Sequence, residues 1–374
     1  MTVVSADEKA ALAASVRAAC DRLAPESRVR ADAFDRHGGV EGFDADLWKV
    51  LCRQVGVAAI AIPESMGGAG YGAAAQAVIA HELGRVLAPV PFVASAVLAT
   101  ELLVAAGAPV ELLRSLADGD ITAAVVLTVD GGIWENRSNA VRARRRDNVW
   151  TLDGAVRHVL NGSTADQLVV VADVDGEAEI FVVATAEQGV AVTAENVLDR
   201  TRPMGSITFT ASRAERLTPR QPVEELVGRC LHRALAVLSA EQVGVCERVL
   251  ELATQYARTR EQFGRAIGSF QAVKHRCANM LVQLEMARSA SMAAVQSVDD
   301  DDDEAGWRAS MAKAVCSEAL REMAHENLQI HGGIGFTSEH AAGWFVKRAR
   351  TDEVLFGRTG DHWSRLATGA RVFA

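Results

Sequence analysis

Apolar and polar positions follow three different patterns along the chain. In residues 1–120 the apolar residues, mostly Ala and Leu, recur at the spacing of amphipathic helices, as in ADLWKVLCRQV. Residues 121–216 instead carry short β-branched runs such as QLVVVADV, separated by Asp, Gly and Asn, which are typical of strands. Residues 217–374 return to helical spacing. The pattern predicts an N-terminal helical domain, a middle β domain and a C-terminal helical domain.

Helices and strands thus come in blocks and do not alternate, which predicts an α+β fold with an antiparallel β domain. One polar run interrupts the C-terminal helices. DDDDDE at 299–304 is too self-repelling for a helix interior, so we expect a loop between two helices there. Because the run lacks the spaced ligands and the glycine of an EF-hand, a solvated loop is preferred to a calcium site.

Composition narrows the class of protein. The chain of 374 residues is 49% hydrophobic and 23% charged, as is ordinary for a globular protein. Its net charge of −9 argues against a nucleic-acid binder or an anionic-membrane binder. No apolar run is long enough for a transmembrane helix, and Asp7, Glu8 and Lys9 interrupt the stretch that a signal peptide needs, so a cytoplasmic protein is expected. The scattered cysteines disfavour zinc ligation and disulfides, and no metal site is predicted.

Two segments carry candidate chemistry. YARTREQFGRAIGSFQAVKH (256–275) places Arg258, Arg260 and Arg265 around the end of a helix. Helix capping explains these cations without a ligand, and a guanidinium site for a pyrophosphate explains them about equally well. LQIHGGIGFTSEH (328–340) follows another helix, and its glycines allow a ligand or a second backbone to approach closely. This spacing is not the G-x-G-x-x-G fingerprint of a dinucleotide-binding fold.

Together these segments resemble the acyl-CoA dehydrogenase family over nearly the full chain. The matching motifs, in the family's order, are AIPESMGGAG (61–70), HELGRVLAPVPF (81–92), LLRSLADGD (112–120), TREQFGRAIGSFQ (259–271) and QIHGGIGF (329–336). The resemblance implies an N-terminal helical domain, a central β domain and a C-terminal four-helix bundle, assembled as dimers or tetramers. It also implies α,β-dehydrogenation of an acyl-CoA thioester: a carboxylate removes the Cα proton, hydride passes to FAD, and an electron-transfer flavoprotein accepts the electrons.

Each FAD site of this family is shared between two subunits, and the contacts that come from the neighbouring subunit match well. The resemblance implies that this chain supplies them from one polar and aromatic stretch and one glycine turn. They are Arg260 and Gln262 near the pyrophosphate, Phe263 against the cofactor, Ile267, Phe270 and Gln271 along the same groove, and Gln329, Gly332 and Gly333 near the pyrophosphate and ribose.

The contacts that clasp the flavin ring match poorly. Where the family has a loop containing glycine and serine, this chain has LTVDGGIWENRSNA (127–140). Where the family has a tryptophan against the flavin and a threonine bonding near N5, this chain has His158 and Leu160, and leucine cannot donate a hydrogen bond. His158 is interpreted as a surface or packing histidine in preference to one that stacks on a ring.

The catalytic base of the family is missing as well. Phe356 stands at the commoner position of the glutamate, with Arg358 where a threonine usually lies, and Ala234 stands at the alternative position. Glu241 borders the apolar face of its predicted helix and is the nearest substitute. It is a candidate base if desolvated, or a hydrogen-bond partner for a neighbouring helix.

The leading hypothesis is a subunit that lacks its own base and ring contacts and completes the FAD site of a related, catalytically complete chain in a heterotetramer. The two-chain acyl-CoA dehydrogenases of actinobacterial sterol side-chain degradation resemble this arrangement. Two alternatives stay open: a self-sufficient homo-oligomeric enzyme that uses Glu241, and a flavin-free binding or scaffold protein. Asp199 and Arg202 are interpreted as a structural pair at a β turn, or else as contacts to an acyl ligand.

Overall fold

The computed structural model describes residues 2–31, 42–127, 140–337 and 340–369. The first block of the chain is helical, and it contributes much of the main hydrophobic core. Its elements are α1 (Ala6–Leu23), α2 (Glu26–Arg30), α3 (Ala45–Val50) with its continuation η2 (Leu51–Val55), η3 (Glu64–Met66), α4 (Ala73–Arg85), η4 (Phe92–Ala99) with its continuation α5 (Thr100–Ala105), and α6 (Val110–Ala117).

In the described part of the next block, seven strands form one sheet in the order β1-β4-β2-β3-β7-β5, with β6 paired to β7. They are β1 (Ala123–Val126), β2 (Val141–Arg146), β3 (Val149–Leu160), β4 (Gln167–Val174), β5 (Glu177–Ala184), β6 (Val190–Ala194) and β7 (Met204–Leu217). Because β4 also pairs with β5, the sheet closes on itself. The prediction of an antiparallel domain was wrong at two pairings. Both β1 and β2 run parallel to β4.

The closed sheet separates two cores. Alternate residues of β4 and β5 point to opposite faces, as the pleat requires. Leu168, Val170 and Phe181 pack inside the closed sheet, whereas Val169 and Ile180 pack outward against the helices. Strands buried on both faces explain why these segments read as continuous apolar runs.

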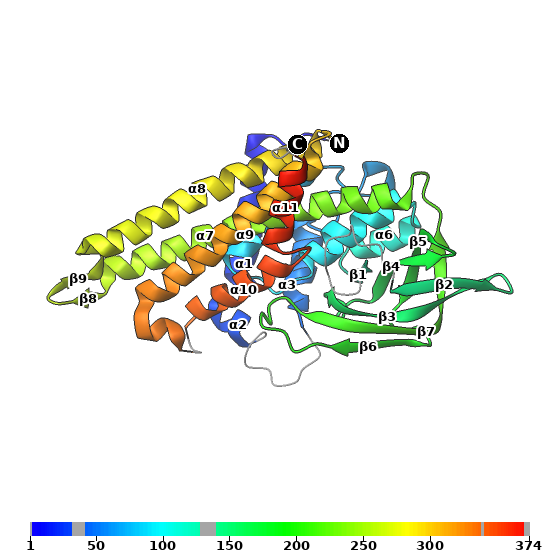
Figure 1. Ribbon diagram of the computed structural model, residues 1–374, viewed down its shortest axis with the longest axis horizontal. Coiled ribbons are helices and arrows are strands. Elements are labelled where there is room, and N and C mark those ends of the chain that lie inside the picture. The colour runs from blue at the N-terminus through cyan, green and yellow to red at the C-terminus, as the bar shows by residue number, and fades with distance from the viewer. Residues whose placement is uncertain (1, 32–41, 128–139, 338–339, 370–374) are drawn as a thin grey trace.

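The last block contains three long helices that run side by side, with a small hairpin at their far end (Figure 1). Two shorter helices pack against the third long one. The elements are α7 (Val223–Thr259), β8 (Glu261–Gln262), β9 (Arg265–Ala266), η5 (Ile267–Ser269), α8 (Gln271–Asp299), α9 (Ala305–His331), η6 (Gly332–Phe336), α10 (Ala342–Val354) and α11 (Thr359–Gly369).

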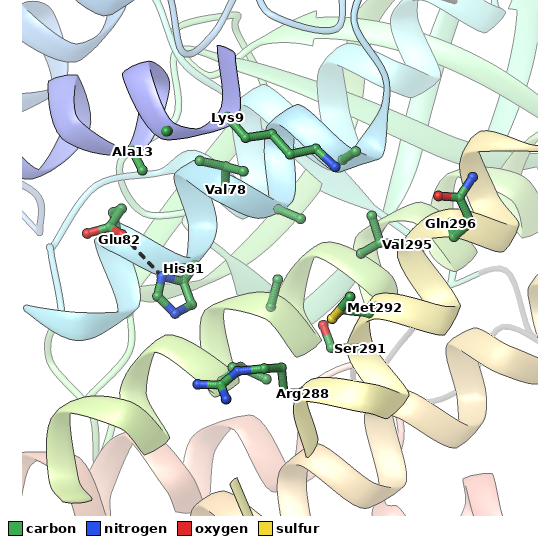
Figure 2. A pocket seen from close by; sticks show the side chains of 15 residues that line it. Lys9, Ala13, Val78, His81, Glu82, Arg288, Ser291, Met292, Val295 and Gln296 are labelled. Atoms are coloured by element: carbon green, nitrogen blue, oxygen red, sulfur yellow. Dashed lines mark hydrogen bonds and ion pairs between the residues drawn. The ribbon is translucent and has the colours of Figure 1, made fainter. Parts of the chain in front are cut away.

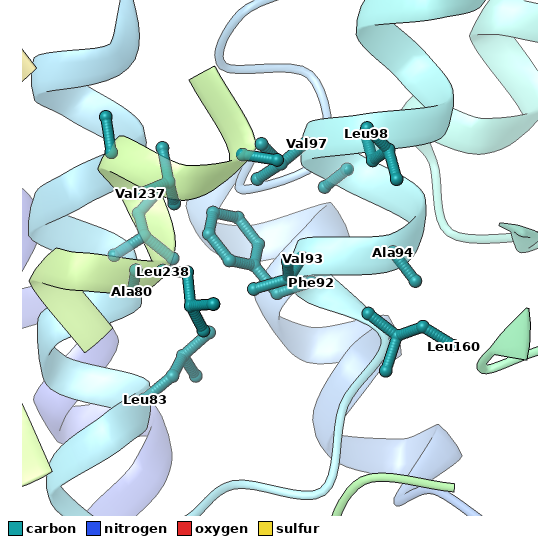
Figure 3. Packing of buried hydrophobic residues seen from close by; sticks show 14 of the residues in the cluster. Ala80, Leu83, Phe92, Val93, Ala94, Val97, Leu98, Leu160, Val237 and Leu238 are labelled. Atoms are coloured by element: carbon teal, nitrogen blue, oxygen red, sulfur yellow. The ribbon is translucent and has the colours of Figure 1, made fainter. Parts of the chain in front are cut away.

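Helices α4 and α7 pack closely because two glycines face the opposite helix. A Cβ atom on Gly244 would lie 2.0 Å from the carbonyl oxygen of His81, and one on Gly84 would lie 2.3 Å from that of Glu241. Beside this contact, Phe92 of η4 fills the space next to Leu238 of α7 (Figure 3). This core joins the N-terminal helices to the bundle.

The predicted loop between α8 and α9 is confirmed, but the acidic run does more than contact solvent. The carboxylate of Asp299 accepts hydrogen bonds from the backbone N–H groups of Ala73, at 2.5 Å, and Ala74, at 2.9 Å, and so caps the start of α4. Asp302 accepts from Ser297 Oγ and from the N–H of Glu304. Among the described residues no cluster of metal-ligating side chains is found, and none of their helices is long and apolar enough to span a membrane.

Candidate functional site: an exposed bundle tip and a filled interior

Most of the residues expected to contact FAD lie at the far end of the bundle. The hairpin β8–β9 carries Gln262 and turns at Phe263, whose side chain is 92% exposed and whose φ is a left-handed 54°. Arg260 ends α7, and its guanidinium has no hydrogen bond or ion pair within the described ranges. Phe263 meets Phe270 edge to face at 6.2 Å, and Arg265 lies over the Phe270 ring. Ile267 and Gln271 follow in the η5 turn and at the start of α8.

The glycine turn at the end of α9 lies at the same end of the bundle. Tyr256 of α7 stacks on His331 of α9 with ring centroids 4.4 Å apart, which brings the two helix ends together. Gly332 has a φ of 62°, and Gly333 is exposed. A Cβ atom on either glycine would meet nothing within 4 Å, so the space beside this turn is open. Residues 258–271 and 329–336 are named the bundle tip below.

The bundle tip presents groups that a single chain leaves unused. Arg260 offers a fork of donors suited to a phosphate, and Phe263 offers an exposed ring. Phe336 and Ile334 add further exposed apolar surface, at 66% and 49%. Apart from its edge-to-face contact with Phe270, the ring of Phe263 stays in solvent on a left-handed backbone, which burial within the described residues does not explain. These residues therefore fit a ligand with anionic and aromatic parts, as FAD has.

The residues at the ring-side positions do not fit a flavin. Leu160 is buried at 7% exposure and belongs to the core in Figure 3. His158 was interpreted above as a surface or packing histidine. Its ring Nδ1 lies 2.5 Å from one carboxylate oxygen of Glu195, and its backbone N–H donates to the other oxygen at 3.0 Å. The stretch compared with the family's glycine- and serine-containing loop lies almost wholly outside the described residues.

The two positions of the family's base hold side chains that cannot accept a proton. Ala234 is fully buried in α7. Phe356, in the turn between α10 and α11, packs against the main core with a φ of 56°. Its carbonyl oxygen lies 3.1 Å from Nε2 of the buried His362, and this contact links the turn to α11. Arg358 donates its backbone N–H to Asp361. This turn is a structural element.

Glu241 is buried and bound by two arginines. One carboxylate oxygen accepts hydrogen bonds from both Arg202 and Arg348. A carboxylate compensated in this way has no free charge with which to abstract a proton from a substrate. The geometry favours the alternative that Glu241 is a hydrogen-bond partner for neighbouring elements.

The same two arginines bind further carboxylates. Asp199 and Arg202 do form a turn, in which the Arg202 backbone N–H donates to the Asp199 carbonyl oxygen at 3.1 Å, but their side chains have other partners. Asp199 is paired with Arg348, whose Nε lies 2.5 Å from Oδ2. Arg202 is paired with Glu241, and its Nε lies 3.3 Å from Asp352 Oδ1. Burial raises the pKa of Asp199, but Arg348 and the bond from Thr201 outweigh it and hold the pKa below its usual value. Asp199, Arg202, Glu241, Arg348 and Asp352 are named the ion-pair cluster.

The ion-pair cluster occupies the junction of the sheet, η4, α7 and α10. The cavity left beside Arg202, Glu241 and Arg348 measures about 20 Å³, which is room for about one water molecule. Leu83, Phe92 and Val93 also line it. An acyl chain or a flavin ring cannot enter this space.

A second, partly buried charge cluster, which the sequence did not reveal, joins α4 to α7. His81 lies between Glu82, 3.3 Å from Nδ1, and Glu247, 3.1 Å from Nε2. Burial lowers the pKa of His81, but its hydrogen bonds to Glu247 and Glu82 outweigh burial and raise the pKa to about 9. Arg17 of α1 binds Glu82 through two hydrogen bonds. The motif HELGR, noted above only for family resemblance, therefore contributes to helix packing.

The charge on His81 predicts a pH-dependent stability difference. Because the pKa is about 9 in the folded chain and about 6.5 unfolded, the stabilisation is fully present below pH 6.5 and is lost as pH rises through 9. The loss of stability in His81→Gln should therefore be larger at pH 6 than at pH 10, by up to about 3 kcal/mol. Urea unfolding at both pH values measures it, with the exposed His275→Gln as control. A pH-independent difference would contradict the assignment.

The chain thus combines N-terminal helices, a closed sheet and a helical bundle with an exposed tip. Two family models match the sequence, that of the acyl-CoA dehydrogenase N-terminal domain over residues 6–119 and that of the C-terminal domain over residues 225–370. The acyl-CoA dehydrogenase IpdE2 of Mycobacterium tuberculosis is 34% identical over 92% of this chain and 91% of its own length. The chain belongs to the acyl-CoA dehydrogenase family, a family of oxidoreductases.

Solved structures give the same result. The ChsE4–ChsE5 complex from Mycobacterium tuberculosis contains a chain that superposes with a TM-score of 0.86 at 29% identity, covering 99% of both chains. A steroid acyl-CoA dehydrogenase made of Tcur3481 and Tcur3483 gives a TM-score of 0.86 at 28% identity, covering 97% of this chain and 99% of that chain. The fold expected from the sequence is confirmed.

Proposed function

We propose that this chain is the non-catalytic subunit of a FAD-dependent acyl-CoA dehydrogenase and completes the FAD site of a related catalytic chain. The ion-pair cluster carries the proposal. Its arginines compensate the charge of Glu241, and its side chains fill the junction of sheet and bundle, where an acyl substrate would need space. The exposed bundle tip is the complementary observation, because Arg260 has no ion pair among the described residues and most of the Phe263 ring is exposed.

In the proposed complex each group at the bundle tip has a defined task. Arg260 and Gln262 bind the pyrophosphate, and Phe263 packs on the cofactor. Ile267, Phe270 and Gln271 line the groove, while Gln329, Gly332 and Gly333 meet the pyrophosphate and ribose. Bound FAD supplies the acceptor for hydride, and the base comes from the partner chain. This chain's residues bind and orient; they transfer no proton.

The relatives support a two-chain assembly. The names of both solved relatives pair two different proteins, ChsE4 with ChsE5 and Tcur3481 with Tcur3483, and the latter is described as a steroid acyl-CoA dehydrogenase. We accordingly propose a heterotetramer that acts on a bulky acyl-CoA, with a steroid-derived or fatty acyl group, and passes electrons to an electron-transfer flavoprotein.

Reconstitution tests this function. The chain is purified alone and together with a related acyl-CoA dehydrogenase that carries the family's glutamate, and visible absorbance reports the bound flavin. We expect a colourless chain alone, and a yellow hetero-oligomer that oxidises acyl-CoA. A yellow homo-oligomer with acyl-CoA oxidation of its own would exclude the proposal, and flavin-free complexes with every partner would favour a scaffold.

Glu241→Gln separates the proposed function from the self-sufficient enzyme. The amide keeps the shape of the side chain but removes the negative charge that compensates Arg202 and Arg348. We expect unchanged turnover per folded complex, together with a loss of about 3 kcal/mol or more in the free energy of unfolding. A fall of turnover by two orders of magnitude in a fully folded variant would instead identify Glu241 as a base.

A further inference from the structure

A groove unrelated to the bundle tip opens between α1, α4, α7 and α8. Its volume is about 490 Å³, within the usual range of small-molecule sites. Alanines create the space: Ala10 and Ala13 on α1 and Ala74 and Ala77 on α4 leave room where larger side chains would fill the gap between the helices.

The walls of the groove are apolar. Val78 on one side faces Met292 and Val295 on the other (Figure 2). Met292 is 67% exposed, and a flexible thioether adapts its shape to a ligand at low cost. Burial of this apolar surface would favour the binding of an apolar group in the groove.

Some charged groups around the groove form ion pairs among the described residues, and one does not. His81 is held by Glu82 and Glu247, and Arg288 binds Glu247 and Glu285. Both cations are therefore compensated. Lys9, whose side chain extends along the rim in Figure 2, has no hydrogen bond or ion pair from its ammonium group in the part of the chain that the structure describes.

We propose that this groove binds a small carboxylate with an apolar body, such as an alkanoate. The apolar chain lies between α4 and α8, and the carboxylate reaches the ammonium group of Lys9. Glu82 does not oppose such an anion strongly, because Arg17 and His81 already compensate its charge. The site is separate from the proposed FAD contacts and does not depend on them.

Calorimetric titration of the chain with decanoate tests the proposal, with decanamide as the neutral analogue. Ala13→Phe fills the groove, and Ala14→Phe places the same ring on the exposed neighbouring position of α1. We expect saturable decanoate binding that Ala13→Phe weakens at least tenfold and Ala14→Phe leaves unchanged. Matching thermal melts of the two variants show that both fold.

Lys9→Gln tests the anion specificity. It should weaken decanoate binding about two- to fivefold, as for an exposed ion pair, and leave decanamide binding unchanged. Lys49→Gln, on α3 and outside the groove, should change neither. Absence of saturable binding, or binding insensitive to Ala13→Phe or Lys9→Gln, would overturn the proposal. A different result would also overturn it: no decanoate binding by the wild type, together with loss of the partner chain from the Ala13→Phe variant. The groove would then belong to the protein interface.

Discussion

Arg348→Met should destabilise the folded chain by about 3–5 kcal/mol. The guanidinium of Arg348 binds Asp199 through Nε and Glu241 through Nη1, and it donates through Nη2 to Thr201 at 2.6 Å. All of these side chains are buried. Methionine keeps much of the side chain's volume but leaves two carboxylates short of their cation in a region that water hardly enters. The cost arises because uncompensated charge stays buried, and not because packing is lost.

Arg350→Met is the matched control for this prediction. Arg350 lies two residues further along α10, is exposed, and pairs with Glu353 three residues away. Exposed pairs of this kind contribute about 0–1 kcal/mol, so this variant should unfold almost as the wild type does. Urea unfolding of both variants gives the comparison. Equal midpoints for the two variants would show that the ion-pair cluster is not essential for stability.

The sequence revealed the bundle tip but not the ion-pair cluster, for a physical reason. Arg260 and Phe263 lie within one short segment, so their neighbours in space are largely their neighbours in sequence. Arg348, by contrast, meets Glu241 across 107 positions and Asp199 across 149. No local spacing reports such a contact. The turn that joins Asp199 to Arg202 was recognised, since the Arg202 backbone N–H donates to the Asp199 carbonyl oxygen, but the side-chain partners of both residues come from distant segments.

The fold was predictable for a similar reason. Helical and strand periodicities are local, and they place the change from helices to strands close to β1 and the return to helices close to α7. Closure of the sheet also depends on pairings between strands that are not consecutive, which periodicity does not report. These are β2 with β4, β3 with β7 and β5 with β7. Asp299, which caps α4 from 226 positions away, shows the same limit for a single side chain.

Arg260→Ala should weaken FAD binding by the hetero-oligomer about ten- to a hundredfold, the usual worth of a hydrogen bond between charged groups. This result rests on the proposed function. Arg260 is exposed, and no side chain within the described ranges binds its guanidinium, so its removal costs the isolated chain almost nothing. Its effect should therefore appear in the flavin content of the complex and not in the melting of the chain alone.

Arg229→Ala provides the control on the same helix. Arg229 is also exposed, but it lies near the start of α7, far from the bundle tip, and donates to Gln221. Flavin absorbance per complex during dialysis, with complex size checked by light scattering, measures both variants. If Arg260→Ala complexes keep as much FAD as Arg229→Ala complexes, the bundle tip does not hold the pyrophosphate. If they keep their size but lose FAD, the arginine acts on the cofactor and not on assembly, because a disrupted interface would lose both together.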